Sequence, residues 1–432
     1  MEENLDSRDQ VSRREFIKNS AGAAVSLAAL SAGTAGLYAA GEERIRAGLV
    51  GCGGRGTGAL RNLVDAAKVV NIPLEIRCLA DPVPERLQKA SEEFQVPQET
   101  CFPGFDGYRK VLQSDIDIVL LVTPPVFRPL HFEAAIEAGK HVFMEKPVAV
   151  DPVGARRMLE TGNIAEQKKL SVVAGTQRRY QRGYRKNKAL LEAGAIGRIV
   201  GGSVWWCMGA LWHKNHSDGE SAADYLVKNW VSFVEMSGDH IVEQHIHNLD
   251  VANWFIGRHP ETALGFGGRL RRKTGNQYDS FSVDYDYGDG CRIHSMCRQI
   301  PGCYDRVGEE FLGTDGSMTG EGKVKNGRNI TVPEIGGHDD SCVQEHIDLL
   351  NSILSGAPMN GTKNVTESTM TAMMGRISAY TGEIVRWSDL TDNKESNWYN
   401  LTYLPSPEAF EAGNVIVPPE GVPPVPGADP KE

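Results

Sequence analysis

The sequence lacks the features of disulfide-rich, zinc-binding and nucleic-acid-binding proteins. Its eight cysteines are scattered, with no C-x-x-C pair and no zinc spacing, so we interpret them as packing residues. The net charge is −10, and beyond the N-terminus there is neither a basic run nor an interleaving of basic and aromatic residues. We therefore expect no nucleic acid and no anionic membrane as partner, and favour a small neutral or polar molecule.

Long apolar runs are also missing from the sequence that follows the N-terminal segment. No stretch there approaches the ~18 apolar residues of a membrane span. We expect no integral membrane domain beyond an N-terminal signal. The sequence has no internal repeat. With 432 residues, of which 41% are hydrophobic and 24% are charged, the chain is long enough for two or three domains of a soluble enzyme.

The N-terminus resembles an export signal. Residues 12–18 read S-R-R-E-F-I-K, a twin-arginine motif, and residues 21–40 form a mildly apolar segment rich in alanine, glycine and serine. We predict a signal and linker over residues 1–42, export by the twin-arginine translocase, and a periplasmic or envelope-associated protein. No clean small-x-small site precedes Gly41, so cleavage and retention as an anchor both stay open. The alternative is a short amphipathic helix with two chance arginines.

A glycine-rich loop stands between a predicted strand and a predicted helix. An apolar run over residues 45–50 precedes it, and residues 57–70 have helical periodicity. In a dinucleotide-binding loop Gly51 permits the tight turn, Gly53 lets the backbone approach a pyrophosphate, and Gly56 lets the helix pack closely on the sheet. G-x-G-x-x-G alone is weak in a chain with 47 glycines, but its flanking elements support a nucleotide site. The predicted contacts in this loop are Gly51, Gly53, Gly54, Arg55 and Gly56.

The second predicted strand, residues 74–80, ends at an acidic residue. Asp81 lies a little farther beyond Gly56 than the roughly 20 residues expected for the acid that binds the adenosine ribose. A carboxylate there would repel a 2'-phosphate, so NAD is favoured over NADP. A second interpretation is that Asp81 and Pro82 start a turn and cap the helix from Pro84. The two roles are compatible.

Apolar strands and helical patterns alternate up to residue 177, which predicts a parallel sheet covered on both faces. We assign residues 43–177 to an NAD-binding Rossmann domain. The predicted strands at residues 116–122 and 141–144 are each followed by polar residues, at the sheet edge where open α/β sheets bind ligands. The cofactor contacts predicted at this edge are Thr123, Pro124, Glu145 and Lys146.

Residues 178–402 show alternating strand patterns that predict an α/β domain with a large, open, mostly antiparallel sheet. These patterns occur at residues 199–206, 262–269, 281–287 and 292–298. We expect this domain to bind the substrate and its open sheet to form a homo-oligomer. The tail, residues 403–432, contains Pro-Pro pairs and little to bury, so we expect it to be extended or to wrap around a neighbour.

Three motifs, in this order along the chain, resemble the glucose-fructose oxidoreductase and inositol dehydrogenase family (Gfo/Idh/MocA). They are the glycine loop, A-G-K-H-V at residues 138–142 with Glu145-Lys146-Pro147 after it, and His247-x-x-Asp250-x-x-x-Trp254-x-x-Gly257. The resemblance spans roughly residues 44–390. It implies a Rossmann domain, an open-faced α/β domain, and NAD or NADP between them. It also implies oxidation or reduction of a hydroxyl carbon on a sugar or cyclitol.

The resemblance assigns the catalytic roles. Lys146 corresponds to the family's lysine near the nicotinamide and the substrate oxygen, where a cation stabilises a developing alkoxide. His247 matches the catalytic histidine, a general acid or base. Glu243 stands where many members have aspartate, which leaves the proton route open. If residues 237–250 form a helix, Glu243 and His247 share a face. Glu145 is interpreted as an orienting or nicotinamide-contacting group.

Further substrate contacts are predicted more weakly at Arg178, His245 and Asp250. Arg178 follows the last Rossmann strand, His245 is placed at the mouth of the site, and Asp250 is expected to position either the substrate or its helix. A metal bound by Glu243, His245 and His247 is disfavoured, because three ligands within five residues fit a strand better than the helix implied by the family. The family often has a histidine where this chain has Arg128.

Two functions of different class remain. The first is an oxidoreductase that transfers a hydride between a sugar, glycoside or cyclitol hydroxyl carbon and a tightly bound nicotinamide cofactor. The second is an NAD-dependent glycosidase or lyase that oxidises the sugar only transiently. Net NADH formation distinguishes the first from the second.

Overall fold

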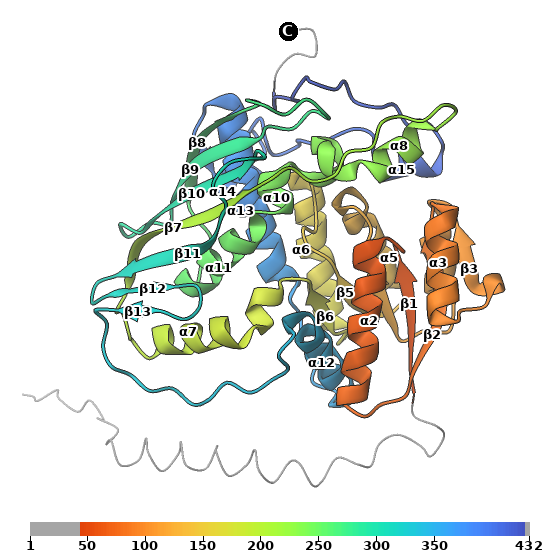
Figure 1. Cartoon of the computed structure of the whole chain (residues 1–432), viewed down its shortest axis with the longest axis horizontal. Helices are drawn as coiled ribbons and strands as arrows, with labels where there is room; N and C mark the ends of the chain where they lie inside the picture. Colours follow the sequence, from red (N-terminus) through yellow and green to blue (C-terminus); the bar gives the residue numbers. More distant parts are fainter. Residues whose placement is uncertain (1–43, 428–432) are drawn as a thin grey trace, which may run out of the picture. The chain divides into compact units, whose positions relative to one another are not determined.

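The structure of the chain is a computed structural model that describes residues 44–427. The twin-arginine motif at residues 12–18 lies outside the described residues. A six-stranded and an eight-stranded sheet organise the described part (Figure 1). Within that part, no helix is both long and apolar enough to cross a membrane.

The six-stranded sheet is the predicted Rossmann sheet. Its strand order is β3-β2-β1-β4-β5-β6, and all neighbours run parallel. All four residues of the central strand β4 are buried, because helices cover both faces of such a sheet. The strands are β1 (Ile45–Val50), β2 (Leu74–Asp81), β3 (Cys101–Pro103), β4 (Ile118–Leu121), β5 (His141–Met144) and β6 (Val172–Ala174).

One helix that covers this sheet comes from far along the chain. The local helices are α2 (Gly54–Val69), α3 (Pro84–Phe94), α4 (Gly107–Gln113), α5 (Arg128–Glu137) and α6 (Pro152–Gln167). The distant one is α12 (Ser341–Leu354), which packs against α2, β5 and β6. The segment assigned from sequence to the substrate domain therefore contributes a helix to the Rossmann sheet.

The eight-stranded sheet has the order β13-β12-β11-β7-β10-β9-β8-β14. Strands β7 and β10 pair in parallel and the other neighbours are antiparallel, as predicted. In β9 the side chains of Phe281, Val283 and Tyr285 are buried and those between them are partly exposed, so one face is covered. The strands are β7 (Ile199–Met208), β8 (Thr262–Gly268), β9 (Ser280–Asp286), β10 (Arg292–Gln299), β11 (Arg306–Gly313), β12 (Ser317–Thr319), β13 (Val324–Lys325) and β14 (Val385–Arg386).

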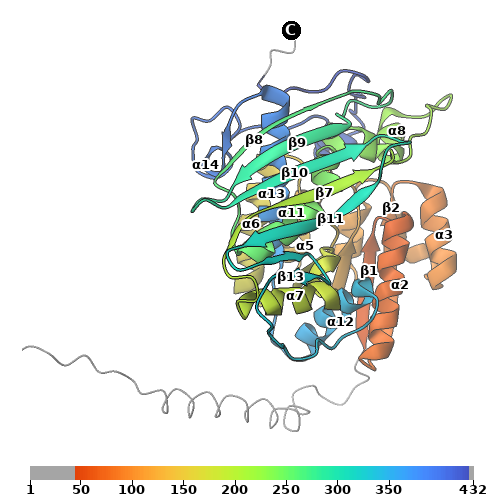
Figure 2. The same cartoon turned by 60° about the vertical axis from the view of Figure 1, so that its left-hand side comes forward.

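Two helices form most of the cover of the buried face: α11 (Ile246–Ile256) packs on β7 and β11, and α13 (Thr362–Thr381) packs on β8 and β9. Figure 2 shows the strands in front of these helices, with the other face of the sheet uncovered. The remaining helices of this part are α7 (Arg182–Glu192), α8 (Ala222–Lys228), α9 (Val234–Ser237), α10 (His240–Glu243) and α14 (Trp387–Thr391).

The C-terminal tail packs on its own chain, which differs from the prediction that it has little to bury. It is mostly irregular, with one short helix, α15 (Pro407–Glu411). Tyr403 is 9% exposed and Phe410 is 2% exposed. These two aromatic side chains anchor the tail to the rest of the protein. The sequence prediction had relied on the proline content of the tail and not on its few apolar residues.

Candidate functional site

The glycine loop joins β1 to α2 with the geometry that a dinucleotide requires. Gly51 has φ +99°, in the left-handed region. A Cβ at Gly56 would lie 1.7 Å from the carbonyl oxygen of Gly51, so any larger residue there would push the helix from the strand. A Cβ at Gly53 or Gly54 would meet nothing within 4 Å, which leaves the backbone there open to a ligand.

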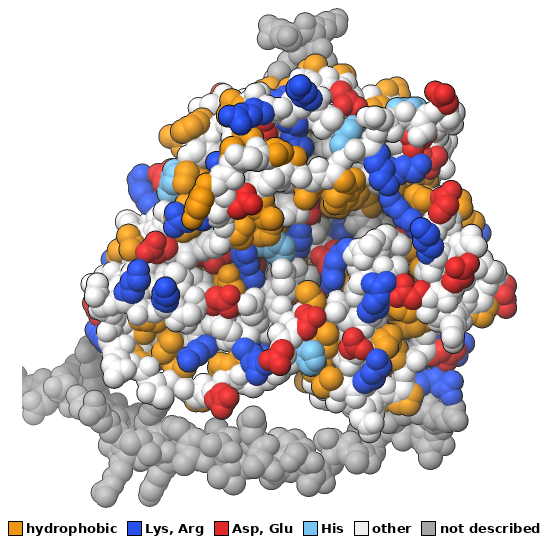
Figure 3. Space-filling view, viewed as in Figure 1, with side chains coloured by type: hydrophobic (Ala, Val, Ile, Leu, Met, Phe, Trp, Pro, Cys, Tyr) orange, Lys and Arg blue, Asp and Glu red, His pale blue; other side chains and the backbone are white. Residues whose placement is uncertain are grey.

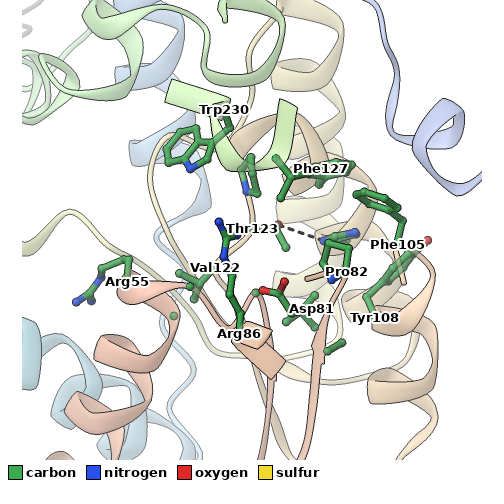
Figure 4. A pocket seen from close by; sticks show the side chains of 18 of the residues that line it. Arg55, Asp81, Pro82, Arg86, Phe105, Tyr108, Val122, Thr123, Phe127 and Trp230 are labelled. Atoms are coloured by element: carbon green, nitrogen blue, oxygen red, sulfur yellow. Dashed lines mark hydrogen bonds between the residues drawn. The ribbon is translucent and has the colours of Figure 1, made fainter. Parts of the chain in front are cut away.

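A cavity of about 200 Å³ lies over this loop, and we call it the nucleotide cavity. Figure 4 shows Asp81 and Arg86 on one side of it and Phe105, Tyr108 and Phe127 on another. Trp212 and Trp230, from the second domain, also line it. Its lining contains the predicted cofactor contacts Gly51, Gly53, Gly54, Arg55, Gly56, Asp81, Thr123 and Pro124.

Asp81 is placed both to start the turn after β2 and to face a ligand in the nucleotide cavity, the two roles considered from the sequence. One carboxylate oxygen accepts a hydrogen bond from Cys52 N at 2.7 Å and the other from Val83 N at 2.8 Å, so the side chain holds the loop and starts the turn. It is 3% exposed and lines the nucleotide cavity. Burial raises the pKa of Asp81, and the two backbone donors oppose that rise. Its role as ribose acceptor stays a prediction that this placement allows.

A second cavity of about 350 Å³ adjoins the first, and we call it the reaction cavity. The two cavities share five lining residues, which are Arg55, Val122, Thr123, Trp212 and Trp230. In space-filling view this face of the protein is hollowed, with lysine, arginine and histidine side chains in the hollow (Figure 3). The predicted catalytic residues Lys146, Glu243 and His247 all line the reaction cavity.

Lys146 points across the cavity to the short helix α10. Its Nζ donates to the backbone oxygen of Glu243 at 2.6 Å and to Glu243 Oε1 at 3.1 Å. The lysine side chain is 11% exposed and the glutamate side chain 9%. A nearly dry ion pair therefore fixes the ammonium group at the wall of the cavity.

His247 enters the cavity from the start of α11. Burial lowers its pKa well below the ordinary value, and the positive charges of Lys146 and Arg178 lower it further. The ring stacks on Trp206 with 5.5 Å between ring centroids. His247 is therefore neutral near pH 7, the form that can accept a proton.

The helix expected over residues 237–250 is interrupted. α10 ends at Glu243, α11 begins at Ile246, and Gln244 and His245 connect them. Glu243 and His247 still reach the same cavity, but from two helices instead of one face of a single helix. A run of four residues such as α10 is too short for sequence periodicity to resolve its end.

Three predicted substrate contacts, Arg178, His245 and Asp250, line neither cavity and are engaged in buried polar pairs. Arg178 forms an ion pair with Glu309. Asp250 accepts from Arg179 Nε at 2.9 Å and from Ser368 Oγ at 2.8 Å.

His245 lies in the interior instead of at the mouth of the site. Its side chain is fully buried, and its Nε2 lies 2.7 Å from Ser295 Oγ. Burial lowers its pKa to about 3. Together with Arg178 and Asp250, His245 is thus absent from the linings of both cavities.

The sequence did not indicate a cluster of two carboxyl groups around Arg55. Arg55 Nε donates to Glu145 Oε1 at 2.5 Å, and Arg55 Nη2 lies 3.7 Å from Glu345 Oε1. Gly175 leaves room for Glu145, since a Cβ there would lie 2.5 Å from Glu145 Oε2. Burial raises the pKa of Glu345 well above its usual value, and the neighbouring Glu145 carboxylate raises it further. Glu345 lies on α12, and no local motif pointed to it.

Arg128, where the family often has histidine, is a buried residue in the lining of the reaction cavity. Its guanidinium donates to the carbonyl oxygens of Leu121 at 2.6 Å, Thr123 at 2.6 Å and Glu145 at 3.0 Å. It thus ties the end of β4 to the end of β5. In the described residues no three His, Cys, Asp or Glu side chains lie together as a metal site would require.

Two family models match the chain, one after the other. The NAD-binding Rossmann-fold model of the Gfo/Idh/MocA oxidoreductase family matches residues 45–175, and its C-terminal α/β-domain model matches residues 188–398. The chain belongs to the Gfo/Idh/MocA oxidoreductase family. Membership confirms the predicted fold class, the NAD cofactor and the oxidoreductase class. The glycine loop and Asp81 fit that cofactor, while the roles of individual site residues stay predictions.

Relatives of known activity are distant. The chain is 24% identical over 289 residues to scyllo-inositol 2-dehydrogenase (NAD(+)) of Bacillus subtilis, covering 64% of this chain and 74% of that enzyme. It is 27% identical over 221 residues to inositol 2-dehydrogenase of Salmonella typhimurium, covering 50% of this chain and 56% of that enzyme. The structure of Lactobacillus casei scyllo-inositol dehydrogenase with NAD(H) and scyllo-inositol superimposes with a TM-score of 0.61 at 22% identity, over 80% of this chain and 99% of that one.

Proposed function

We propose that the protein is an NAD-dependent dehydrogenase of cyclitols or sugars. The observation that carries the proposal is the convergence of Lys146, Glu243 and His247 on a cavity that adjoins the nucleotide cavity. Relatives of the chain include inositol dehydrogenases, which supports a polyhydroxylated ring as substrate. The reaction cavity, at about 350 Å³, has room for one such ring.

Oxidation of a secondary alcohol releases a hydride from carbon and a proton from oxygen. The bound NAD would accept the hydride. The neutral imidazole of His247 takes the proton, and the ammonium group of Lys146 stabilises the alkoxide as its charge develops. Glu243 holds Lys146 at the cavity wall and balances its charge. In the opposite direction His247 returns the proton to the carbonyl oxygen.

The first experiment identifies cofactor and substrate together. The purified protein is denatured and the released NAD and NADH are separated by chromatography, before and after incubation with myo-inositol, scyllo-inositol, aldoses and glycosides. We expect one nucleotide per chain, reduced by at least one cyclitol or sugar. Glycoside cleavage without net NADH would favour the glycosidase or lyase, and a chain that binds no NAD would overturn both.

We further propose export by the twin-arginine route to the periplasm or cell envelope. The support is the motif at residues 12–18 and the apolar segment after it. Outside the cytoplasm there is no ready NAD pool, so the protein would carry its cofactor across folded and recycle it in place. Replacing Arg13 and Arg14 together by lysine should leave the protein in the cytoplasmic fraction, whereas unchanged fractionation would contradict the proposal.

We also propose a homo-oligomer through the open face of the eight-stranded sheet. Apolar side chains project from that face, with Phe266 73% exposed, Leu264 50% exposed and Met296 38% exposed. Such an uncovered apolar surface is typical of an interface. Phe266→Asp should lower the mass measured by light scattering to that of a smaller assembly. An unchanged mass would place the interface elsewhere.

A further inference from the structure

The C-terminal tail extends beyond the part of the chain that the family models describe. The C-terminal α/β-domain model ends at residue 398, and the described chain continues to residue 427. The tail returns across the top of the molecule in Figure 1, with α15 at its start. Its contacts join the two walls of the nucleotide cavity.

The first contact is with the Rossmann wall of that cavity. Phe410, 2% exposed, packs its ring 5.1 Å from Phe105 and 4.9 Å from Phe127, measured between centroids. Phe105 and Phe127 both line the nucleotide cavity. Phe410 therefore forms the layer directly behind this aromatic wall.

An electrostatic contact lies beside it. Glu411 accepts from Arg109 Nη2 at 3.0 Å and from the hydroxyl of Tyr108 at 3.2 Å. Tyr108 also lines the nucleotide cavity, and its ring lies 4.2 Å from that of His131. The tail thus fixes three aromatic side chains of one wall, through Phe410 and Glu411.

The second contact lies behind the opposite wall. Glu420 accepts from Gly275 N at 2.9 Å and from the hydroxyl of Tyr225. Tyr225 belongs to α8, which also carries Val227, and the chain continues to Trp230. Val227 and Trp230 line the nucleotide cavity from the second domain. One continuous segment therefore contacts side chains of the first wall and the helix that carries part of the second.

We propose that residues 404–427 form a cofactor strap that fixes the adenosine end of the nucleotide cavity and slows NAD exchange. Asp81 is the predicted ribose acceptor, and Phe105, Tyr108 and Phe127 line the same cavity, so in this proposal they form the adenine wall. A flat aromatic wall binds a purine best when its rings are held in place from behind. Phe410 and Glu411 are positioning residues, since they act through the side chains of the wall. The inference rests on the proposed NAD site.

The test measures exchange of the cofactor and not catalysis. The full-length purified protein is loaded with radiolabelled NAD, freed of excess nucleotide, and diluted into unlabelled NAD, and the retained label is followed over time. We expect Phe410→Ala to release label roughly 10-fold faster than the wild type, and Glu411→Gln and Glu420→Gln to release it several-fold faster. The KM for added NAD should rise, with little change in kcat.

Matched controls come from the same segment. Ile416 is 81% exposed, so Ile416→Ala removes an apolar side chain of the tail without a wall contact. Glu408 is exposed on α15, so Glu408→Gln removes a charge from the same helix. Both should exchange NAD at the wild-type rate. The melting temperature of the NAD-free Glu411→Gln variant should equal that of the wild type, which separates the strap from a general loss of fold.

The failures of the two proposals are distinguishable. A wild-type protein that retains no label overturns the NAD site itself. A wild-type protein that retains label, with Phe410→Ala, Glu411→Gln and Glu420→Gln all exchanging at its rate, overturns the strap and leaves the dehydrogenase proposal intact.

Discussion

Replacing Lys146 by methionine removes the cation of the reaction cavity while keeping an unbranched side chain that is one atom shorter. A positioned donor or cation of this kind contributes about 10²–10³ in kcat, which is about 2.7–4 kcal/mol of transition-state stabilisation. Lys146→Met should therefore reduce bound NAD at least about 100-fold more slowly. It should retain NAD, because the glycine loop and Asp81 are untouched.

The same change leaves Glu243 in a nearly dry site without its partner. Removing one member of a buried pair costs about 3–5 kcal/mol of folding free energy. The lower end applies here, since Gln244 Nε2 still donates to Glu243 Oε2 at 2.5 Å. The double variant Lys146→Met with Glu243→Gln has no unpaired carboxylate. We expect it to recover the melting temperature but not the rate.

The pH dependence of the rate gives a second, independent test of Lys146→Met. The charge of Lys146 is the largest contribution after burial to the lowered pKa of His247. Without that charge the pKa of His247 rises, the imidazole holds a proton over a wider range, and the acidic limb of the rate profile moves to higher pH.

The assay is single-turnover reduction of bound NAD at 340 nm with the substrate found in the panel. Lys68→Met serves as the control, because its side chain is 70% exposed on α2. A Lys146→Met variant that turns over within threefold of the wild type would refute the role of this lysine.

Three further predictions concern the cofactor loop and the buried carboxyl group. Gly56→Ala should abolish NAD retention and lower the melting temperature, because its Cβ would lie 1.7 Å from a backbone oxygen, whereas Gly54→Ala should keep the melting temperature of the NAD-free protein. Asp81→Asn should weaken NAD binding roughly 10-fold and raise the ratio of NADP to NAD affinity in titration calorimetry; an unchanged ratio would argue against a ribose contact. Burial raises the pKa of Glu345, so the folded chain holds a proton there that the unfolded chain releases above about pH 4.3. Stability is therefore lost as pH rises from that value through the raised pKa, and Glu345→Gln should flatten the decline in melting temperature with pH; a parallel decline in both proteins would contradict this.

The local part of the fold could be predicted from the sequence because it depends on neighbouring residues. Strand, glycine loop and helix follow one another within the first domain, and alternation in β9 shows which residues face the core. The glycine at position 56 follows from a contact with position 51 a few residues away. That Lys146 and His247 lie at one site could be predicted because each belongs to a short motif of the family that the sequence resembles, and both line the reaction cavity.

Only the tertiary structure brings together residues that no spacing connects. Glu345 joins Arg55 and Glu145 because α12 crosses back onto α2, and Phe410 reaches Phe105 because the tail returns over the first domain. It also separates residues that the sequence placed together, since the break after Glu243 turns His245 into the interior while His247 faces the cavity. Sequence periodicity reports the environment of a residue over a few turns or strands. The packing of whole helices and strands decides which distant side chains share a cavity. The periodicity of a single sequence does not show how those elements pack.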